Sequence, residues 1–151
     1  MKSLVVYYSR TNVTKKLAES IAGAIDADIE EIIPKVNYNG KMGYVRGGKD
    51  AISKNVIDIE PTEYDPADYD MVYLGTPVWA SKMSSPLKAY IKQNEGKFEN
   101  VKFFVTAGGS GTDSTIKQIE EFTKTPQATL ALTTKEVKKD LYEEKLADFI
   151  K

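Results

Sequence analysis

Short apolar runs alternate with longer amphipathic segments along the whole chain. Runs that are apolar at consecutive positions and rich in Val, Ile or Tyr are typical of strands covered on both faces of a parallel sheet. The pattern predicts five strands, at residues 3–8, 29–33, 71–75, 102–106 and 128–133. The first run is the most continuous, so we expect it at the centre of the sheet.

Helices are predicted between these strands from the spacing of apolar residues and from end signals. They are expected at 14–26, 85–91, 112–122 and 134–151. Ser85 has the form of an N-cap, and Thr133 with Glu136 forms a capping-box pair. Strands that alternate with helices in this way indicate a doubly wound α/β domain.

Residues 35–68 are the least regular part of the chain. Four glycines weaken its helical pattern, so we expect an irregular crossover helix at 44–54. Against the single acid Asp50, residues 35–54 carry five basic side chains: Lys35, Lys41, Arg46, Lys49 and Lys54. A solvated face explains this charge, and a docking surface for an acidic or phosphorylated partner is the alternative.

Composition limits the available chemistry. The 151 residues fit one domain spanning 1–151. The chain contains no Cys and no His, which excludes disulfides, iron–sulfur clusters, thiol nucleophiles and imidazole acid–base catalysis. Any redox or transfer chemistry must therefore come from a cofactor.

Charge and the length of the apolar runs bear on partners and location. There are 21 basic and 22 acidic side chains, for a formal net charge of -1. This balance favours neither nucleic acid nor an anionic membrane as the main partner. The apolar runs are too short to span a bilayer, and the chain starts directly with a strand, without a signal-peptide pattern. We expect a cytoplasmic protein.

Three loops follow predicted strands, and in a parallel sheet their ends meet at one edge. The first loop precedes a helix N-terminus, where unpaired N–H groups and the helix dipole favour an anion. Its residues are Ser9, Arg10, Thr11, Asn12, Val13 and Thr14. Three hydroxyls in six residues exceed what one helix cap requires, which points to a bound phosphate. A well-capped helix is the simpler alternative.

The second and third loops add a ring and a flexible backbone. The second comprises Thr76, Pro77, Val78, Trp79 and Ala80. Because this connection is expected to be exposed, its tryptophan is predicted to be a platform for a planar ligand rather than a seal over the core. The third comprises Ala107, Gly108, Gly109, Ser110, Gly111 and Asp113. Its glycines let the backbone approach a ring, while the carboxylate suits a helix start whatever the function.

These three loops, in this order, resemble those of the flavodoxins and flavodoxin-like FMN proteins. In that family a loop S/T-x-T-G-x-T holds the FMN phosphate, and here Asn12 stands in the glycine position, where it tolerates left-handed backbone angles. The second loop resembles the one that places an aromatic ring against the isoalloxazine. The third resembles the loop that bonds the pyrimidine edge through backbone groups.

The resemblance implies a flavodoxin-like three-layer α/β sandwich of the short-chain type, with five parallel strands in the order 2-1-3-4-5. FMN is the implied cofactor, and no metal is expected. The implied function is low-potential electron transfer between protein redox partners by a monomer or weak dimer. Asp113, if close to the ring, would disfavour the reduced anionic flavin by like-charge repulsion.

Two departures from the family leave a second function open. The third loop has no aromatic residue, so one face of the flavin is expected to be open, and the chain is less acidic than most flavodoxins. An open face suits an FMN-dependent NAD(P)H reductase of quinones, nitro or azo compounds. A nicotinamide Rossmann domain, a phosphoacceptor receiver and a Walker-type nucleotidase are not supported, since their glycine or carboxylate signatures are missing.

Overall fold

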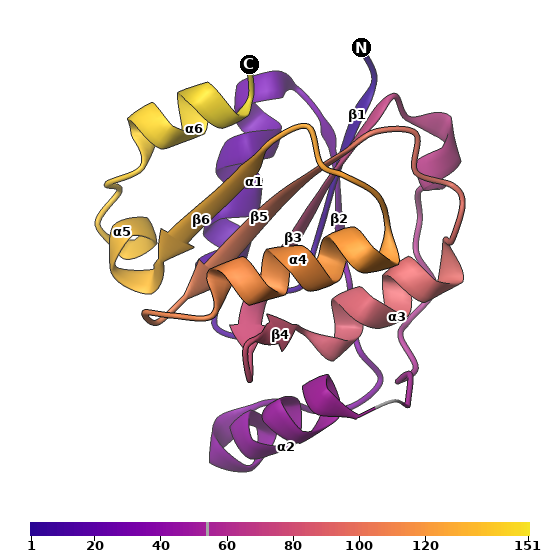
Figure 1. Cartoon of the computed structure of the whole chain (residues 1–151), viewed down its shortest axis with the longest axis vertical. Coiled ribbons are helices and arrows are strands. Elements are labelled where there is room, and N and C mark those ends of the chain that lie inside the picture. The colour runs from indigo at the N-terminus through magenta and orange to yellow at the C-terminus, as the bar shows by residue number, and fades with distance from the viewer. Residues whose placement is uncertain (54) are drawn as a thin grey trace.

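Five parallel strands form the centre of the computed structural model, which describes residues 1–53 and 55–151. They are β1 (Ser3–Tyr7), β2 (Asp28–Glu31), β3 (Met71–Trp79), β5 (Val101–Ala107) and β6 (Thr129–Thr133). Their order in the sheet is β2-β1-β3-β5-β6 (Figure 1). This is the predicted arrangement of five parallel strands, and the labels differ only because β4 is a short additional strand.

The strand β3 is longer than predicted. It runs on through residues 76–79, which were expected to be an exposed loop, and pairs with the antiparallel β4 (Lys82–Met83). The two strands are joined by Ala80 and Ser81, both with positive φ (51° and 62°), as in a type I′ hairpin turn. Since neither residue is Gly, Asn or Asp, the sequence carries no signal for this turn.

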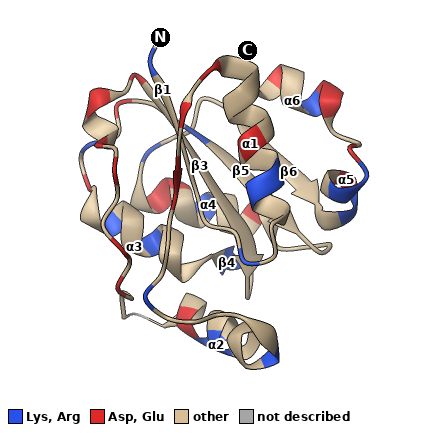
Figure 2. Ribbon diagram, turned by 180° about the vertical axis from the view of Figure 1, so that it is seen from behind, with Lys and Arg blue, Asp and Glu red and all other residues tan. Residues whose placement is uncertain are grey.

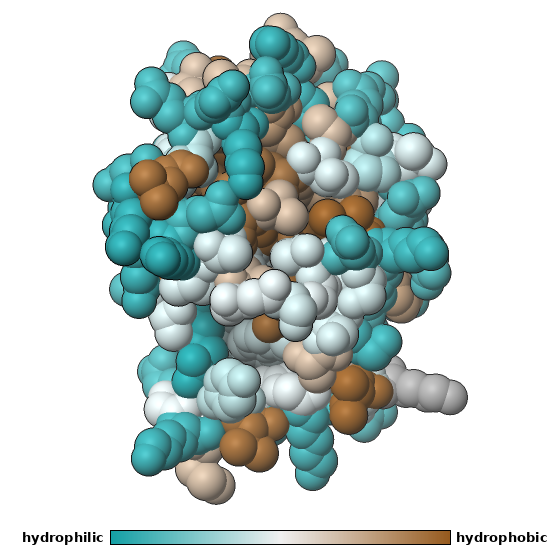
Figure 3. Space-filling view, turned by 60° about the vertical axis from the view of Figure 1, so that its left-hand side comes forward, coloured by the Kyte–Doolittle hydropathy of each residue, from teal (hydrophilic) through white to brown (hydrophobic). Residues whose placement is uncertain are grey.

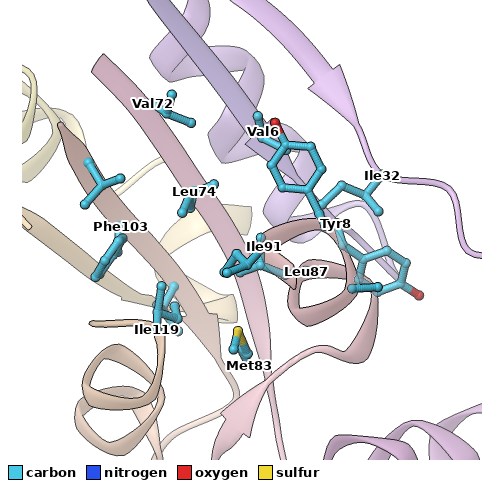
Figure 4. Close-up of a cluster of buried hydrophobic side chains, with 14 of the residues drawn as sticks. Val6, Tyr8, Ile32, Val72, Leu74, Met83, Leu87, Ile91, Phe103 and Ile119 are labelled. Atoms are coloured by element: carbon cyan, nitrogen blue, oxygen red, sulfur yellow. The ribbon is translucent and has the colours of Figure 1, made fainter. Parts of the chain in front are cut away.

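Helices cover both faces of the sheet (Figure 1). One face packs against α3 (Ser85–Gln93) and α4 (Thr112–Phe122), and its core is shown in Figure 4. The other packs against α1 (Val13–Ile25), α5 (Thr134–Lys138) and α6 (Glu143–Phe149). A 3-10 turn, η1 (Pro66–Asp68), precedes β3. The three-layer α/β sandwich is confirmed.

Two predicted helix features differ from the structure. The single helix expected at 134–151 is divided into α5 and α6, because Asp140 adopts a left-handed conformation with φ 56°. The N-cap of α3 is Ser84 rather than Ser85, which occupies the first helical position. The capping box of Thr133 and Glu136 is present, with both reciprocal hydrogen bonds.

The helix α2 (Gly40–Ile52) lies apart from the others, beyond the edge at which the strands end (Figure 1). It starts four residues earlier than predicted, and Lys54, the last residue of the predicted helix, lies outside the described residues. Only Gly43, Gly47 and Ala51 of this helix are buried. Within the described ranges, no helix has the length and apolarity needed to cross a membrane.

Candidate functional site

The three loops meet at the carboxyl edge of the sheet, as predicted, around a cavity of about 170 Å³. Its walls are Arg10, Thr11, Val13, Thr14, Tyr44, Pro77, Val78, Trp79, Thr106, Ala107, Gly108 and Thr134. A second cavity of about 150 Å³ shares four of these residues and adds Gly48 and Ala80. The edge therefore holds one composite site with a contribution from each loop.

The first loop turns sharply at its centre and leads directly into α1. Asn12 is left-handed, with φ 68°, so it takes the conformation that a glycine would provide at this position. Its carbonyl accepts the first helical bond of α1, from Lys16 N at 3.1 Å. The hydroxyl of Ser9 is buried without a hydrogen-bond partner in residues 1–53 and 55–151, and Thr11 is exposed. An unpaired buried hydroxyl is expected to have a partner that is supplied from outside the chain.

The third hydroxyl of this loop has a structural role. Thr14 is almost fully buried, and its Oγ1 lies 2.8 Å from Oγ1 of Thr106 in β5. Thr76 is also buried, and its Oγ1 accepts from Ser84 N at 2.9 Å, which holds β3 to the start of α3. These two hydroxyls position the loops, and Thr76 lines neither cavity.

Arg10 ties the first loop to α2. Its Nε donates to the carbonyl of Tyr38 at 2.9 Å, and its Nη2 donates to the carbonyl of Gly40 at 2.7 Å. The guanidinium carbon lies 5.5 Å from the ring centre of Tyr44, within the range of a cation–π contact. A fixed positive charge therefore lines both cavities.

Trp79 is only 8% exposed, so the exposed platform predicted from the sequence is wrong in this respect. Its ring meets Tyr8 and Tyr38 edge-on, at centroid distances of 5.3 and 4.9 Å. A Cβ on Gly47 of α2 would lie 3.2 Å from the same ring. The cover comes from α2 and its approach, which the local sequence of the second loop cannot show. Trp79 still lines both cavities.

The two tyrosines around Trp79 are held neutral. Burial raises the pKa of Tyr8 to about 12, and the nearby Arg10 opposes this increase. Burial, together with a hydrogen bond from its hydroxyl to Asp50 at 2.6 Å, also raises the pKa of Tyr38. At neutral pH this aromatic cluster is uncharged.

The third loop packs against the β3–β4 hairpin. Gly111 has φ 92°, and a Cβ there would lie 2.9 Å from Cγ1 of Val78. The hydroxyl of Ser114 donates to the carbonyl of Ser81 at 2.8 Å. These contacts hold the second and third loops at a fixed spacing.

Within the third loop, Ala107 and Gly108 line the first cavity. Gly108 and Gly109 have open space where a Cβ would be. The other residues predicted from this loop (Gly109, Ser110, Gly111 and Asp113) line neither cavity. Asp113 is exposed in the first turn of α4, where the helix dipole alone favours a carboxylate.

Four lining residues were not among the predicted site residues: Tyr44, Thr106 and Thr134 of the first cavity and Gly48 of the second. Thr134 follows β6, so the rule that strand ends converge could have included it. Tyr44 is on a crossover helix with an irregular pattern, and nothing in that pattern indicates that it reaches the site.

The arrangement fits a phosphorylated planar cofactor. Ser9 and Asn12 line neither cavity, but both belong to the turn that leads into α1. The other residues of this turn (Arg10, Thr11, Val13 and Thr14) line the first cavity together with aromatic and small residues of the second and third loops. Anion binding at a helix start and ring contacts from aromatic walls are the two requirements of such a ligand.

Comparison with known proteins agrees with this chemistry. The family model described as Flavodoxin matches residues 2–151. No curated protein matches the sequence. A flavoprotein from Lactobacillus acidophilus, solved in complex with FMN, is 26% identical, with a TM-score of 0.75 over 91% of this chain and 97% of that one.

Two further solved structures share the fold. A protein from Bacteroides uniformis assigned as a flavoprotein is 22% identical, with a TM-score of 0.78 over 94% of this chain and 98% of that one. An NADH:FMN oxidoreductase is 14% identical, with a TM-score of 0.61 over 99% of this chain and 87% of that one.

The chain belongs to the flavodoxin family. This confirms the resemblance seen in the three loops, the fold class and FMN as the cofactor of the family site.

Proposed function

We propose that this protein is an FMN-binding, low-potential electron-transfer protein that accepts electrons from one protein and passes them to another. FMN supplies the redox chemistry when bound, while the chain supplies binding, orientation and electrostatics. The alternative is an FMN-dependent oxidoreductase that uses NAD(P)H to reduce quinones, nitro or azo compounds.

We assign the phosphate to the first loop. The free hydroxyls of Ser9 and Thr11 and the N–H groups at the start of α1 are the donors available there, and Asn12 shapes the turn. Charge-assisted hydrogen bonds from such donors are roughly twice as strong as neutral ones. We therefore expect the first loop to make the site prefer FMN over riboflavin.

We assign the ring system to the second and third loops. Pro77, Val78 and Trp79 supply the apolar walls, and the backbone of Ala107 and Gly108 faces the same cavity. Because the hairpin and the third loop are fixed against each other at Gly111, these groups keep their spacing without a ligand. Preorganised groups of this kind reduce the ordering cost of binding.

The cover that α2 forms over the site is the observation that carries the choice between carrier and enzyme. Tyr44 and Gly48 of α2 line the cavities beside Trp79. Hydride transfer requires a nicotinamide stacked on the flavin, and this helix restricts the approach of a second ring from its side. A carrier needs only an accessible flavin edge.

One observation favours the enzyme. Gly108 and Gly109 have open space beside them, so a second ring could approach from the third loop. The fold shared with an NADH:FMN oxidoreductase is compatible with either function, because fold alone does not establish activity.

The chain is also charged unevenly around the site. The helix α2, which borders the cavities, carries the exposed basic side chains of Lys41, Arg46 and Lys49, and acidic ones follow the edge strand β2 (Figure 2). Complementary charge guides the encounter of electron-transfer proteins. We therefore expect that a partner docking at α2 has an acidic surface.

Steady-state oxidation of NADH and NADPH by the FMN-loaded protein, with menadione as acceptor, separates the two functions. We expect no saturable turnover, and we expect that the photoreduced protein is reoxidised rapidly by ferricyanide, an anionic one-electron acceptor. Saturable NADH or NADPH oxidation would identify the reductase instead.

A further inference from the structure

The third loop contains no aromatic residue, but the structure brings one to the site from another element. Tyr44, on α2, lines both cavities together with Arg10 and Trp79. Its side chain is 71% exposed, whereas Trp79 is 8% exposed. Tyr44 therefore stands at the solvent side of the site, and Trp79 forms part of its interior.

The first loop holds Tyr44 in this place. Arg10 lies 5.5 Å from the ring centre of Tyr44, and its guanidinium is fixed by the carbonyls of Tyr38 and Gly40. Those carbonyls belong to the segment that leads into α2 and to its first residue. Arg10, which lies between the proposed phosphate donors Ser9 and Thr11, is thus in contact with the start of α2 and with the ring of Tyr44.

The glycines of α2 allow this approach. A side chain on Gly43 would collide with the backbone carbonyl of Tyr38, and a Cβ on Gly47 would be 3.2 Å from the ring of Trp79. The side chains of Met42 and Val45, on either side of this contact, line neither cavity and are 84% and 67% exposed. Hydrophobic side chains also project at the lower end of the molecule in Figure 3, where α2 lies.

We propose that Tyr44 forms the outer aromatic wall of the flavin site and that Arg10 is its positioning residue. The inference rests on the FMN site of the proposed function. Aromatic rings stack favourably on planar heteroaromatic groups, and a ring on a crossover helix supplies the face that the third loop leaves open. Closure of the site then depends on the docking of α2.

Titration of the full-length apoprotein with FMN and with riboflavin, followed by flavin fluorescence, tests this role. Tyr44→Leu is expected to raise both dissociation constants by the same factor, about tenfold, or about 1.4 kcal/mol. Tyr44→Phe keeps the ring and should stay within about twofold of the wild type. Val45→Ala is the matched control on the same helix, and it too should leave affinity unchanged.

A second readout separates stacking from a loss of α2 docking. The emission of Trp79, the only tryptophan, should be the same in apo Tyr44→Leu as in the wild type. At saturation, flavin bound to this variant should fluoresce more strongly, since one quenching ring is lost. If the wild type binds flavin and Tyr44→Leu binds it with the same affinity and the same quenching, the role of Tyr44 is overturned while the proposed function stands. Failure of the wild type to bind either flavin would overturn the proposed function with it.

Discussion

Strand β5 and helix α2 both border the cofactor cavities, but they are held in place by different amounts of packing. Every residue of β5 is buried, between β3 and β6 and under helices on both faces. Only three residues of α2 are buried, all of them small, and its large apolar side chains are exposed. The difference separates a rigid frame, which fixes the loops, from a weakly packed cover, which can adapt to a ligand or a partner.

The largest effect should come from the frame. Phe104 of β5 is fully buried, and its ring fills the space above Gly75. Phe104→Ala is expected to lower the free energy of unfolding by about 3–5 kcal/mol, measured by urea denaturation. Met42→Ala on the exposed face of α2 should change it by less than about 0.5 kcal/mol. Equal effects of the two substitutions would contradict the comparison.

A smaller effect is expected where α2 meets the frame. Gly43→Ala places a methyl group against the backbone carbonyl of Tyr38 and should cost about 1–3 kcal/mol through overpacking. Because α2 covers Trp79, its displacement should also move tryptophan emission to longer wavelength. Gly48→Ala is the matched control, since its Cβ meets open space and a better helix former replaces glycine. An unshifted emission in Gly43→Ala would show that α2 is not held by this contact.

Removal of the Ser9 hydroxyl should stabilise the apoprotein but weaken its binding of FMN. Its buried hydroxyl has no partner among the residues that the structure describes, and a buried unsatisfied group costs about 1–3 kcal/mol. Ser9→Ala should therefore raise the thermal stability of the apoprotein and lower its affinity for FMN, but leave its affinity for riboflavin unchanged. A variant that is less stable and binds FMN normally would remove Ser9 from the phosphate site.

The smallest effect concerns the capping box of α5. The hydrogen bond from Lys145 and the backbone N–H of Thr133 lower the pKa of Glu136 below its usual 4.5. The lowered pKa means that this stabilisation is complete above pH 4.5 and is lost as the pH falls through the folded value. Glu136→Gln should cost about 1 kcal/mol at pH 7 and less below pH 4 by urea denaturation. A cost that does not change with pH would contradict the role of the carboxylate.

The sequence was sufficient to predict the frame for a physical reason. Strands that are buried on both faces need continuous apolar runs, so the pattern of apolar residues along the chain is enough to predict β1, β3 and β5. The carboxyl ends of parallel strands must meet at one edge, so the sequence alone predicts that the three loops lie together.

The cover could not be predicted in the same way. The turn at Ala80 and Ser81 uses left-handed residues without the usual side chains. The break at Asp140 uses a residue type that tolerates this conformation, but a single Asp inside a helical pattern does not by itself predict a break. The burial of Trp79 and the position of Tyr44 depend on where α2 docks. That docking depends on Gly43 and Gly47, which are distant in sequence from the loops. Glycines in a sequence weaken the prediction of a helix and do not indicate where the helix packs.

The visible absorption spectrum of the purified protein, with the cofactor identified after its release, tests the central claim most directly. The site at the three loops predicts a yellow protein that releases FMN in about one-to-one ratio, or an apoprotein that takes up added FMN to the same ratio. A colourless protein that fails to bind added FMN would contradict it.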